Sequence, residues 1–293
     1  MAAIFASLAG TAIVCWTLRE VFTDLFQPSE SGSLSSFLGK TLFRLTKHAR
    51  WMLSSAGPLS IVVVIFCWAS LVSIGFALVS WARFPEGFAR TATESQGGIG
   101  RFWTMLYFSL ASLTTLGSTT FSPTSQWMRM VSSIESLIGI SLLTASITWV
   151  VLIYPALGRM RTLTRLVLAL RRAQEQTGLD LLAGNTQDFM AQLAQGVLRT
   201  RIDFIHFPLI YYFHSDSEGG SLARSLLALD DLATRAFVER KSDETRLGAS
   251  LLKIALDDLA RTLAHKFVRT ADANNTRSVF DAVVRDHLEA EWE

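Results

Sequence analysis

The residues best suited to chemistry form one polar run, Thr114-Thr115-Leu116-Gly117-Ser118-Thr119-Thr120, directly after an apolar segment at 102–113. The apolar segment has a helical pattern but is too short to cross a bilayer, which takes about 20 residues. Longer apolar segments lie on either side of it, at 57–82 and 130–157. Non-helical backbone at membrane depth is tolerated only where it is buried in protein or lines a water-filled cavity. The pattern therefore predicts a short helix that runs into a polar loop lining an aqueous pore, with a polar external turn in a non-conducting membrane protein as the alternative.

Other residues with chemical potential carry less weight. The paired carboxylates Asp230-Asp231 and Asp257-Asp258 would suit a divalent cation at a subunit interface, but such pairs more often form solvated helix faces. His206 and His214 flank an aromatic run. They could act as a proton switch or pack against the aromatic rings, and packing is the favoured role. Cys15 and Cys67 lie in apolar stretches and read as small buried hydrophobes.

Motifs for bound cofactors are missing from the sequence. No glycine-rich dinucleotide fingerprint follows a strand, and the chain holds no P-loop, calcium loop or zinc spacing. No nucleophile stands beside a candidate base. We therefore expect no metal, no cofactor and no enzymatic activity.

The composition separates the chain into two halves. Half of the 293 residues are apolar and only 18% are charged, against about 25% in ordinary soluble domains. Residues 1–157 hold 15 of the Asp, Glu, Lys and Arg residues, and residues 158–293 hold 37. A membrane-embedded half should therefore precede a soluble half. The net charge of +2 excludes a nucleic-acid binder that relies on bulk charge.

A third spanning helix is expected within residues 1–27, where the apolar stretch runs from Ala2 to Leu18. A signal peptide is the alternative, but no basic residue precedes the apolar core and no small-residue cleavage site stands out. An uncleaved helix is favoured. The fold class is an all-α membrane protein with three transmembrane helices, a re-entrant pore helix and a helical cytoplasmic domain at 158–293.

The basic residues predict the orientation. Lys40, Arg44, Lys47 and Arg50 lie in the linker at 28–56, and five arginines follow residue 157. By the positive-inside rule both regions are cytoplasmic, so the N-terminus lies outside a plasma (inner) membrane. The basic spacing also predicts an interfacial helix at 37–53 on anionic lipids, with a solvated loop as the alternative.

The segment 57–157 resembles the pore-loop potassium channel superfamily. Residues that fall in register with its pore motif are Tyr107, Phe108, Ser109, Leu113, Thr114, Thr115, Leu116, Gly117, Pro123 and Thr124. Gly139 falls where these channels keep an inner-helix glycine, and Glu135 begins a phrase common in bacterial members. The resemblance implies a homotetramer around one pore, an inner-helix hinge at Gly139 and a filter formed by Thr114, Thr115, Leu116, Gly117, Ser118 and Thr119 within 114–120.

The filter departs from the family pattern in its outer half. Ser118, Thr119 and Thr120 replace the family's Tyr, Gly and Asp. A residue with a Cβ at position 119 should reshape the outer end, because the family's glycine adopts a backbone that is costly for other residues. The resemblance implies passive flow of a monovalent cation, K⁺ first and Na⁺ second, through Thr115-Leu116-Gly117-Ser118. The alternative is a non-conducting receptor or scaffold that signals through its cytoplasmic helices.

The inner helix carries the remaining candidates. Leu143, Ile147 and Val151 form a stripe that would gate the pore by dewetting, face lipid or pack on the helix at 57–82. Glu135, an ionisable residue in a membrane segment, either acts in function or hydrogen-bonds the back of the pore loop, and support of the filter is favoured. Pro155 should kink the helix.

The second half should be helical throughout. Helical patterns cover 159–176, 179–213 with a break at Pro208, 221–238, 244–268 and 278–292. Nothing in these residues identifies a regulatory ligand or partner.

Overall fold

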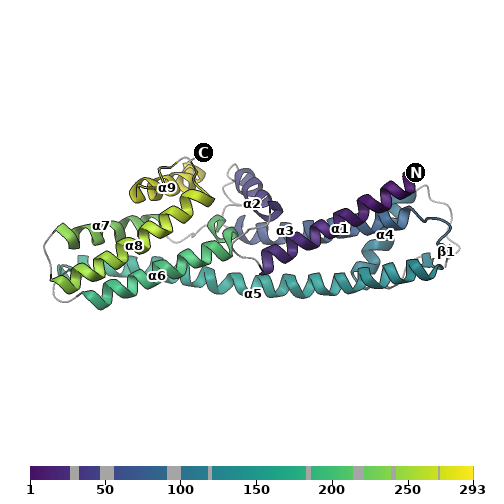
Figure 1. Ribbon diagram of the computed structural model, residues 1–293. Helices are drawn as coiled ribbons and strands as arrows, with labels where there is room; N and C mark the ends of the chain where they lie inside the picture. The colour runs from purple at the N-terminus through teal and green to yellow at the C-terminus, as the bar shows by residue number, and fades with distance from the viewer. Residues whose placement is uncertain are drawn as a thin grey trace. The chain divides into compact units, whose positions relative to one another are not determined.

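The structure is a computed structural model that describes residues 1–26, 33–46, 56–90, 100–117, 121–182, 186–213, 221–238, 242–269 and 271–292. Almost all of these residues are helical (Figure 1). The helices are α1 (Ala2–Phe26), α2 (Ser33–Thr46), α3 (Ala56–Trp81), α4 (Arg101–Leu113), α5 (Gln126–Thr177), α6 (Gln187–His206), α7 (Leu222–Val238), α8 (Asp243–Lys266) and α9 (Thr276–Trp292). A 3₁₀ turn occupies Pro208–Tyr212.

Three helices, α1, α3 and α5, are long and apolar enough to cross a membrane. Their polypeptide lengths exceed the roughly 20 residues that a bilayer requires. The expected fold class, an all-α protein of the membrane with several spans, is confirmed. The pore-helix segment expected at 102–113 corresponds to α4, which has 13 residues and is too short to span.

The chain divides into a first unit, residues 1–35 and 61–151, and a second unit, residues 36–60 and 152–293. Helix α5 contributes to both units and continues through Pro155, where the sequence predicts a kink. The segment at 159–176, expected as a further helical stretch, is the C-terminal part of this same helix.

In the first unit, α1 packs closely on α3 through small residues. A Cβ at Gly10 would overlap the Gly75 carbonyl oxygen, and a Cβ at Gly75 would lie 2.6 Å from a methyl group of Val14. Small residues that allow close backbone approach are the usual means by which membrane helices pack, since apolar burial gives no driving force in lipid. Helix α1 is thus held on α3 within one chain.

A short ribbon of two strands, which was not expected from the sequence, also belongs to the first unit. Strand β1 (Phe88–Arg90) pairs antiparallel with β2 (Phe121–Pro123), with Ala89 opposite Ser122. The amide of Thr124 extends the pairing with a 2.9 Å hydrogen bond to the Gly87 carbonyl. The ribbon joins the chain after α3 to the chain just before α5.

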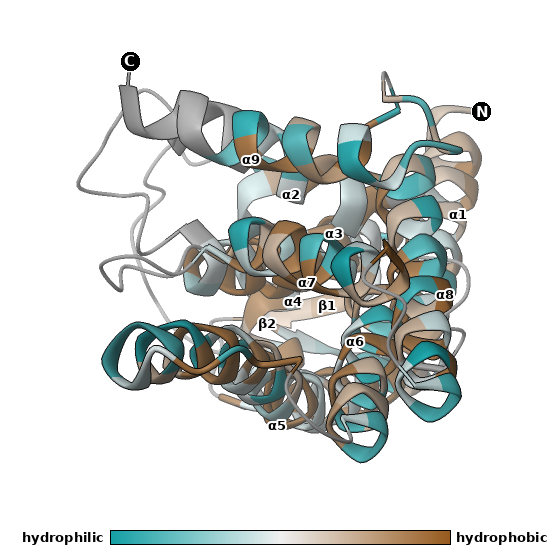
Figure 2. Cartoon of the chain, turned by 90° about the vertical axis from the view of Figure 1, so that its left-hand side faces the viewer, coloured by the Kyte–Doolittle hydropathy of each residue, from teal (hydrophilic) through white to brown (hydrophobic). Residues whose placement is uncertain are grey.

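The second unit is a bundle of amphipathic helices. Figure 2 shows hydrophobic and hydrophilic residues alternating along α8 and α9. Leu252, Leu256 and Leu259 of α8 are fully buried, as are Leu193 and Val197 of α6, and these two helices pack side by side (Figure 1). The start of α6 lies eight residues after the expected 179, while the other bounds in this half lie within two residues of expectation.

The expected interfacial helix at 37–53 overlaps α2, which begins earlier, at Ser33. A Cβ at Gly39 would lie 2.7 Å from Leu209, so this face of α2 packs against Leu209 within the second unit. Phe37 and Lys40 are exposed. The basic residues Lys47 and Arg50 lie outside the described residues, and the lipid contact stays a prediction.

Candidate functional site

The segment expected as the filter, residues 114–120, begins at the C-terminal end of α4, which closes in a Schellman turn. The amide of Thr115 donates to the Ser112 carbonyl over 3.1 Å, and the amide of Leu116 donates to the Ala111 carbonyl over 2.9 Å. These are the two crossed bonds that define the motif. The turn satisfies the last carbonyls of α4 and directs the chain away from the helix axis.

Thr115 occupies the left-handed position of this turn, with φ of 57°. Glycine usually fills it, since a side chain with a Cβ costs about 1–2 kcal/mol there, and a β-branched residue is a genuine outlier. Gly117 follows with φ of 70°, where glycine is free of that cost. Strained backbone of this kind is concentrated at functional sites.

The hydrogen bonds of the turn leave the filter carbonyls unused. Amides 114–116 all donate back to the end of α4, and the Thr114 hydroxyl donates to the Leu110 carbonyl over 2.7 Å. No hydrogen bond between residues that the structure describes ends on the carbonyls of Thr115, Leu116 or Gly117. Residues 114–117 are exposed on the single chain, Leu116 by 63%. Ser118, Thr119 and Thr120 lie outside the described residues.

Glu135 lies behind the pore helix. It is fully buried, and its Oε1 is hydrogen-bonded to the Ser109 hydroxyl of α4. The same hydroxyl is 2.8 Å from the Ser73 carbonyl of α3, so Ser109 links α4 to both α3 and α5. The Oε2 atom of Glu135 has no hydrogen-bond partner among the described residues. Glu135 therefore contacts the expected pore helix, as filter support requires, and makes no hydrogen bond to the described residues 114–117.

A second polar contact follows one turn later. The hydroxyls of Ser112 and Ser132 are 3.2 Å apart, and the Ser136 hydroxyl donates to the Ser112 carbonyl over 2.9 Å. Hydroxyl contacts between helices satisfy polar groups that lipid cannot. Together with the Glu135 contact they fix the rotation of α4 against α5. The spacing of the serines at 109 and 112, and at 132 and 136, could have indicated this interface from the sequence.

Gly139 lies where α5 passes the end of α4. A Cβ at this position would overlap the carbonyl oxygen of Leu113, the last residue of the pore helix. The structure thus gives Gly139 a packing role, because only glycine permits this approach. Helix α5 continues through the position, and the hinge expected there stays a prediction.

The chain downstream of the filter is held by aromatic residues as well as by the ribbon. The ring centroids of Phe88 and Phe108 are 5.1 Å apart in an edge-to-face arrangement, and those of Phe84 and Phe121 are 5.5 Å apart. Phe108 belongs to α4 and Phe121 to β2, so both ends of the filter loop are tied to the segment after α3. None of the phenylalanines at 84, 88 and 121 was identified from the sequence, where they carry no spacing signal.

A cavity of about 320 Å³ lies beside the start of the filter. Its walls are Ile65 and Ala69 of α3, Leu113 to Thr115, and residues of α5 from Gly139 to Ser146. Most of the lining is apolar. In the single chain this leaves space directly against Thr114 and Thr115.

The stripe of Leu143, Ile147 and Val151 is exposed by 63%, 57% and 62%. The opposite face of the same helix is buried, since Leu142, Trp149 and Ile153 are exposed by 8% or less. On this face the ring centroids of Trp149 and of Trp68 in α3 are 5.3 Å apart. The stripe therefore does not pack on α3, which was one of three expectations. A pore face and a lipid face both remain.

The acidic pairs of the second unit face basic residues of the same chain. Asp230 lies 2.6 Å from Lys253, Asp231 lies 2.7 Å from Arg277, and Asp258 contacts Arg261 and Arg201. Asp257 accepts from Thr276 and is 3.6 Å from Lys253. They form an ion-pair network between helices instead of simple solvated faces. His206 packs against Phe207, and His214 lies outside the described residues.

Comparison with known proteins agrees with the site. Residues 61–154 match a family model described as an ion channel. The chain is also similar to an uncharacterized membrane protein, YdjJ, of Bacillus subtilis (strain 168), with 24% identity over 225 residues. That similarity covers 73% of this chain and 64% of the relative, so the chain spans less than two thirds of the relative's length. No solved structure matches.

The family match contains α4, the filter segment and the apolar part of α5. The resemblance to a two-helix channel pore module is therefore confirmed for residues 61–154. The remainder of the chain, including the whole bundle from α6 to α9, lies outside the match.

Proposed function

We propose, from the ion-channel pore module at residues 61–154, that this protein is a homotetrameric channel that conducts monovalent cations passively through Thr115-Leu116-Gly117-Ser118. One chain supplies one filter loop, and a dehydrated cation needs carbonyl oxygens on all sides. Four chains around a common axis supply them.

The observation that carries this proposal is the Schellman turn at the end of α4. It uses the amides of residues 114–116 inside the chain and leaves the next carbonyls unbonded and exposed among the described residues. Unbonded carbonyl oxygens at membrane depth are costly unless water or a cation meets them. The C-terminal partial negative charge of α4 at the same place favours cations over anions.

The selectivity we propose is for K⁺, with Na⁺ as the second candidate. Thr115, Leu116 and Gly117 keep the inner half of the potassium-channel pattern, while Ser118 and Thr119 replace its Tyr and Gly. The inner ring of carbonyls and the Thr115 hydroxyl would then set the selectivity without the outer glycine.

We place the pore in the plasma (inner) membrane with the N-terminus outside and the second unit in the cytoplasm. The basic residues at 40–50 and the five arginines after residue 157 support this orientation. The lipid partner of α2 would be anionic, because the exposed Lys40 and its basic neighbours in sequence would meet its headgroups.

The test is the reversal potential of the purified tetramer in planar bilayers under a potassium-against-sodium gradient. Reversal near the potassium equilibrium potential is the expected result, and reversal near zero would show a non-selective cation pore. If assembled tetramers pass no current, the proposal fails and the alternative, a receptor or scaffold that signals through its cytoplasmic helices, becomes the better one.

A pair of glycine variants assigns the current to the filter. Gly117→Asp should abolish flux while the tetramer assembles, because a residue with a Cβ is strained at the φ of 70° and its charged side chain would lie in the proposed cation path. Gly178→Asp is the matched control, since Gly178 has φ of 67°, open space around it and a position outside the pore module. Normal flux in an assembled Gly117→Asp tetramer would remove the filter assignment.

The double variant Ser118→Tyr with Thr119→Gly tests the outer filter. It restores two positions of the family pattern and should raise the permeability of K⁺ relative to Na⁺. An unchanged ratio would mean that these two positions do not set the selectivity.

A further inference from the structure

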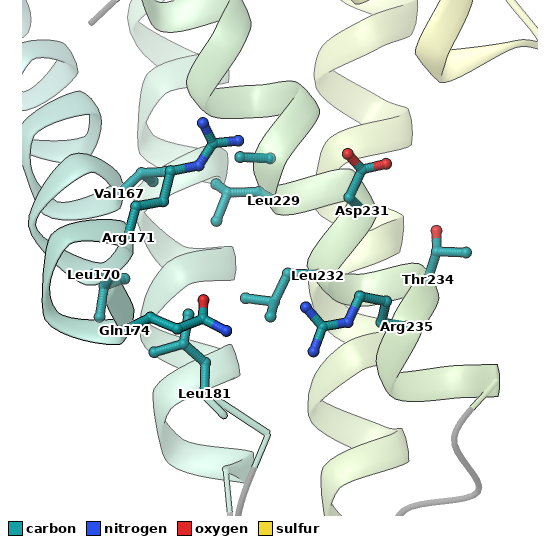
Figure 3. Close-up of a pocket in the computed structure, with 11 residues that line it drawn as sticks. Val167, Leu170, Arg171, Gln174, Leu181, Leu229, Asp231, Leu232, Thr234 and Arg235 are labelled. Carbon is teal, nitrogen blue, oxygen red and sulfur yellow. The ribbon is translucent and has the colours of Figure 1, made fainter. Parts of the chain in front are cut away.

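A second cavity lies within the second unit, between the C-terminal part of α5, Leu181 and α7. Its volume is about 480 Å³, which falls in the range of small-molecule sites in proteins. Apolar residues form much of its lining (Figure 3): Val167, Leu170, Leu181, Ala228, Leu229 and Leu232. Val167, Leu229 and Leu232 are buried, so the apolar wall is part of the bundle's own core.

Two guanidinium groups stand at the edge of this wall. Figure 3 shows Arg171 and Gln174 of α5 on one side of the cavity and Arg235 of α7 on the other. Arg235 is paired with Asp180 over 2.9 Å. Arg171 has no ion pair or side-chain hydrogen bond with any residue that the structure describes.

The acidic residue of the cavity does not neutralise Arg171. Asp231 lies 2.7 Å from Arg277, which is its own cationic partner. The cavity therefore combines an apolar wall, one guanidinium without a partner in the described part of the chain, and the amide of Gln174 beside it. Such a combination is suited to a ligand with an apolar body and one anionic group.

We propose that this cavity is a binding site for a small soluble organic anion, a phosphate or carboxylate carried on an apolar body. Arg171 holds the anionic group, Gln174 donates a further hydrogen bond, and Leu229 and Leu232 receive the apolar body. An apolar pocket with few convergent polar groups fixes the orientation of its ligand in this way.

The position of Arg171 favours a soluble anion over a lipid headgroup. Arg171 is 14 residues beyond Leu157, the expected end of the spanning stretch, and α5 is continuous between them. At 1.5 Å per residue this is about 21 Å, while the headgroup layer is only about 5–8 Å deep on each side. A lipid phosphate at the membrane surface would not reach the cavity along a helix that leaves the bilayer.

A ligand here would hold the C-terminal part of α5 against α7. Because α5 also carries the pore-module residues up to 154, occupancy of the cavity is a means to regulate the gate, a consequence that rests on the proposed channel function. Binding itself does not depend on conduction and is measured without current.

The test is calorimetric titration of the full chain in nanodiscs of neutral lipid with 1-naphthyl phosphate, corrected with empty nanodiscs. Saturable binding of about one probe per chain is expected. Arg171→Gln should weaken binding about tenfold or more, the size of one lost charge-assisted contact. Arg172→Gln is the matched control, because Arg172 is the exposed neighbour on α5 and does not line the cavity.

Two further arms test the ligand class. Inorganic phosphate, which has no apolar body, should bind at least tenfold more weakly than the probe. Nanodiscs that contain phosphatidate should bind the probe as neutral ones do, and competition by phosphatidate would overturn the soluble ligand. Lack of saturable binding to the wild type, or equal affinities for Arg171→Gln and Arg172→Gln, would overturn the site.

Discussion

The two units of this protein use different residues to pair their buried polar groups and to end their helices. In the first unit the buried contacts join Ser109, Ser112 and Glu135 to neighbouring helices through hydroxyls. In the second unit Arg159 holds Asp203 with two hydrogen bonds of 3.0 and 2.6 Å. The difference follows from how far the polar groups of each contact are exposed on the chain.

The exposure of each partner to water determines whether an ion pair or a hydroxyl contact stabilises the buried group at lower cost. Asp203 is 4% exposed, but the Arg159 side chain that pairs with it is 44% exposed and keeps part of its hydration. Ser109 and Glu135 are both fully buried in a unit whose outer surface is apolar. A full ion pair there would lose the hydration of both partners, which costs several kcal/mol for each ion. Hydroxyl contacts avoid most of that cost.

The largest expected effect concerns two glycines on the same helix. Gly139→Ala should prevent normal packing of α4 on α5, because its Cβ would overlap the Leu113 carbonyl and backbone must move. Overpacking costs about 1–3 kcal/mol or more, and a collision with backbone belongs at the upper end. The melting temperature of the purified protein should fall, and the yield of the proposed tetramer should fall with it.

Gly158→Ala is the control, since no atom lies within 4 Å of the Cβ that it would add. Alanine is favoured over glycine in a helix by about 1 kcal/mol, so this variant should be as stable as the wild type or more so. Equal melting temperatures for the two variants would contradict the close approach of α5 to the pore helix.

The next prediction uses the unequal exposure of Arg159 and Asp203. Arg159→Leu leaves a buried carboxylate without its partner and should cost about 3 kcal/mol. Asp203→Leu leaves an arginine that can turn to solvent and should cost less, about 1 kcal/mol. The difference in unfolding midpoints, measured with denaturant, gives the comparison. Equal costs for the two variants would mean that hydration of Arg159 does not offset the loss of its ion pair in Asp203→Leu.

A smaller effect is expected at Tyr211, whose hydroxyl donates to Asp286 over 2.7 Å while its ring stacks on Phe267. Tyr211→Phe keeps the ring and removes the hydrogen bond, at a cost of about 1 kcal/mol. Burial, with the neighbouring Asp286 carboxylate as a second cause, raises the pKa of Tyr211 above its ordinary value.

The sign of the pH dependence follows from that raised pKa. The folded state keeps a proton that the unfolded chain releases above about pH 10, so the stability from this group is complete below pH 10 and lost above it. The wild type should lose part of its advantage over Tyr211→Phe between pH 10 and 11, as measured by unfolding midpoints. A constant advantage over that range would show that Tyr211 titrates normally.

Much of the fold could be predicted because the signals were periodic and local. The spans at 57–82 and 130–157, and the amphipathic stretches that became α7 and α8, depend only on residue spacing. The β1–β2 ribbon was missed, since each strand has three residues and its pairing joins positions more than thirty apart. No local pattern indicates so short a pair.

The sequence indicated which residues to consider for the candidate site, but not the contacts that they make. The filter residues came from a resemblance, and the structure added the Schellman turn that orients them, which depends on the φ of Thr115. The packing role of Gly139 could not be predicted either, because it depends on a carbonyl from another helix. The cavity beside Arg171 is equally non-local, with walls from α5 and α7 that are about 60 residues apart in sequence.

The last comparison concerns the two helix ends, where Thr115→Gly has the smallest effect that we expect. Helix α5 ends with Gly178 in the left-handed position, its amide 2.9 Å from the Gln174 carbonyl, while α4 ends with Thr115 in the same conformation. Thr115→Gly should stabilise the protein by about 0.5–1 kcal/mol, as relief of left-handed strain outweighs the entropy of glycine. Gly178→Thr should destabilise it by about 1–2 kcal/mol.

The same two variants test whether the backbone strain at Thr115 contributes to ion selectivity. The relaxed Thr115→Gly tetramer, with a higher melting temperature, should also conduct less selectively, since it loses a hydroxyl from the filter and gains backbone freedom there. Gly178→Thr should alter stability and leave the reversal potential unchanged. A Thr115→Gly channel that is both more stable and equally selective would mean that the strain at Thr115 has no functional purpose, and would place the selectivity in carbonyls alone.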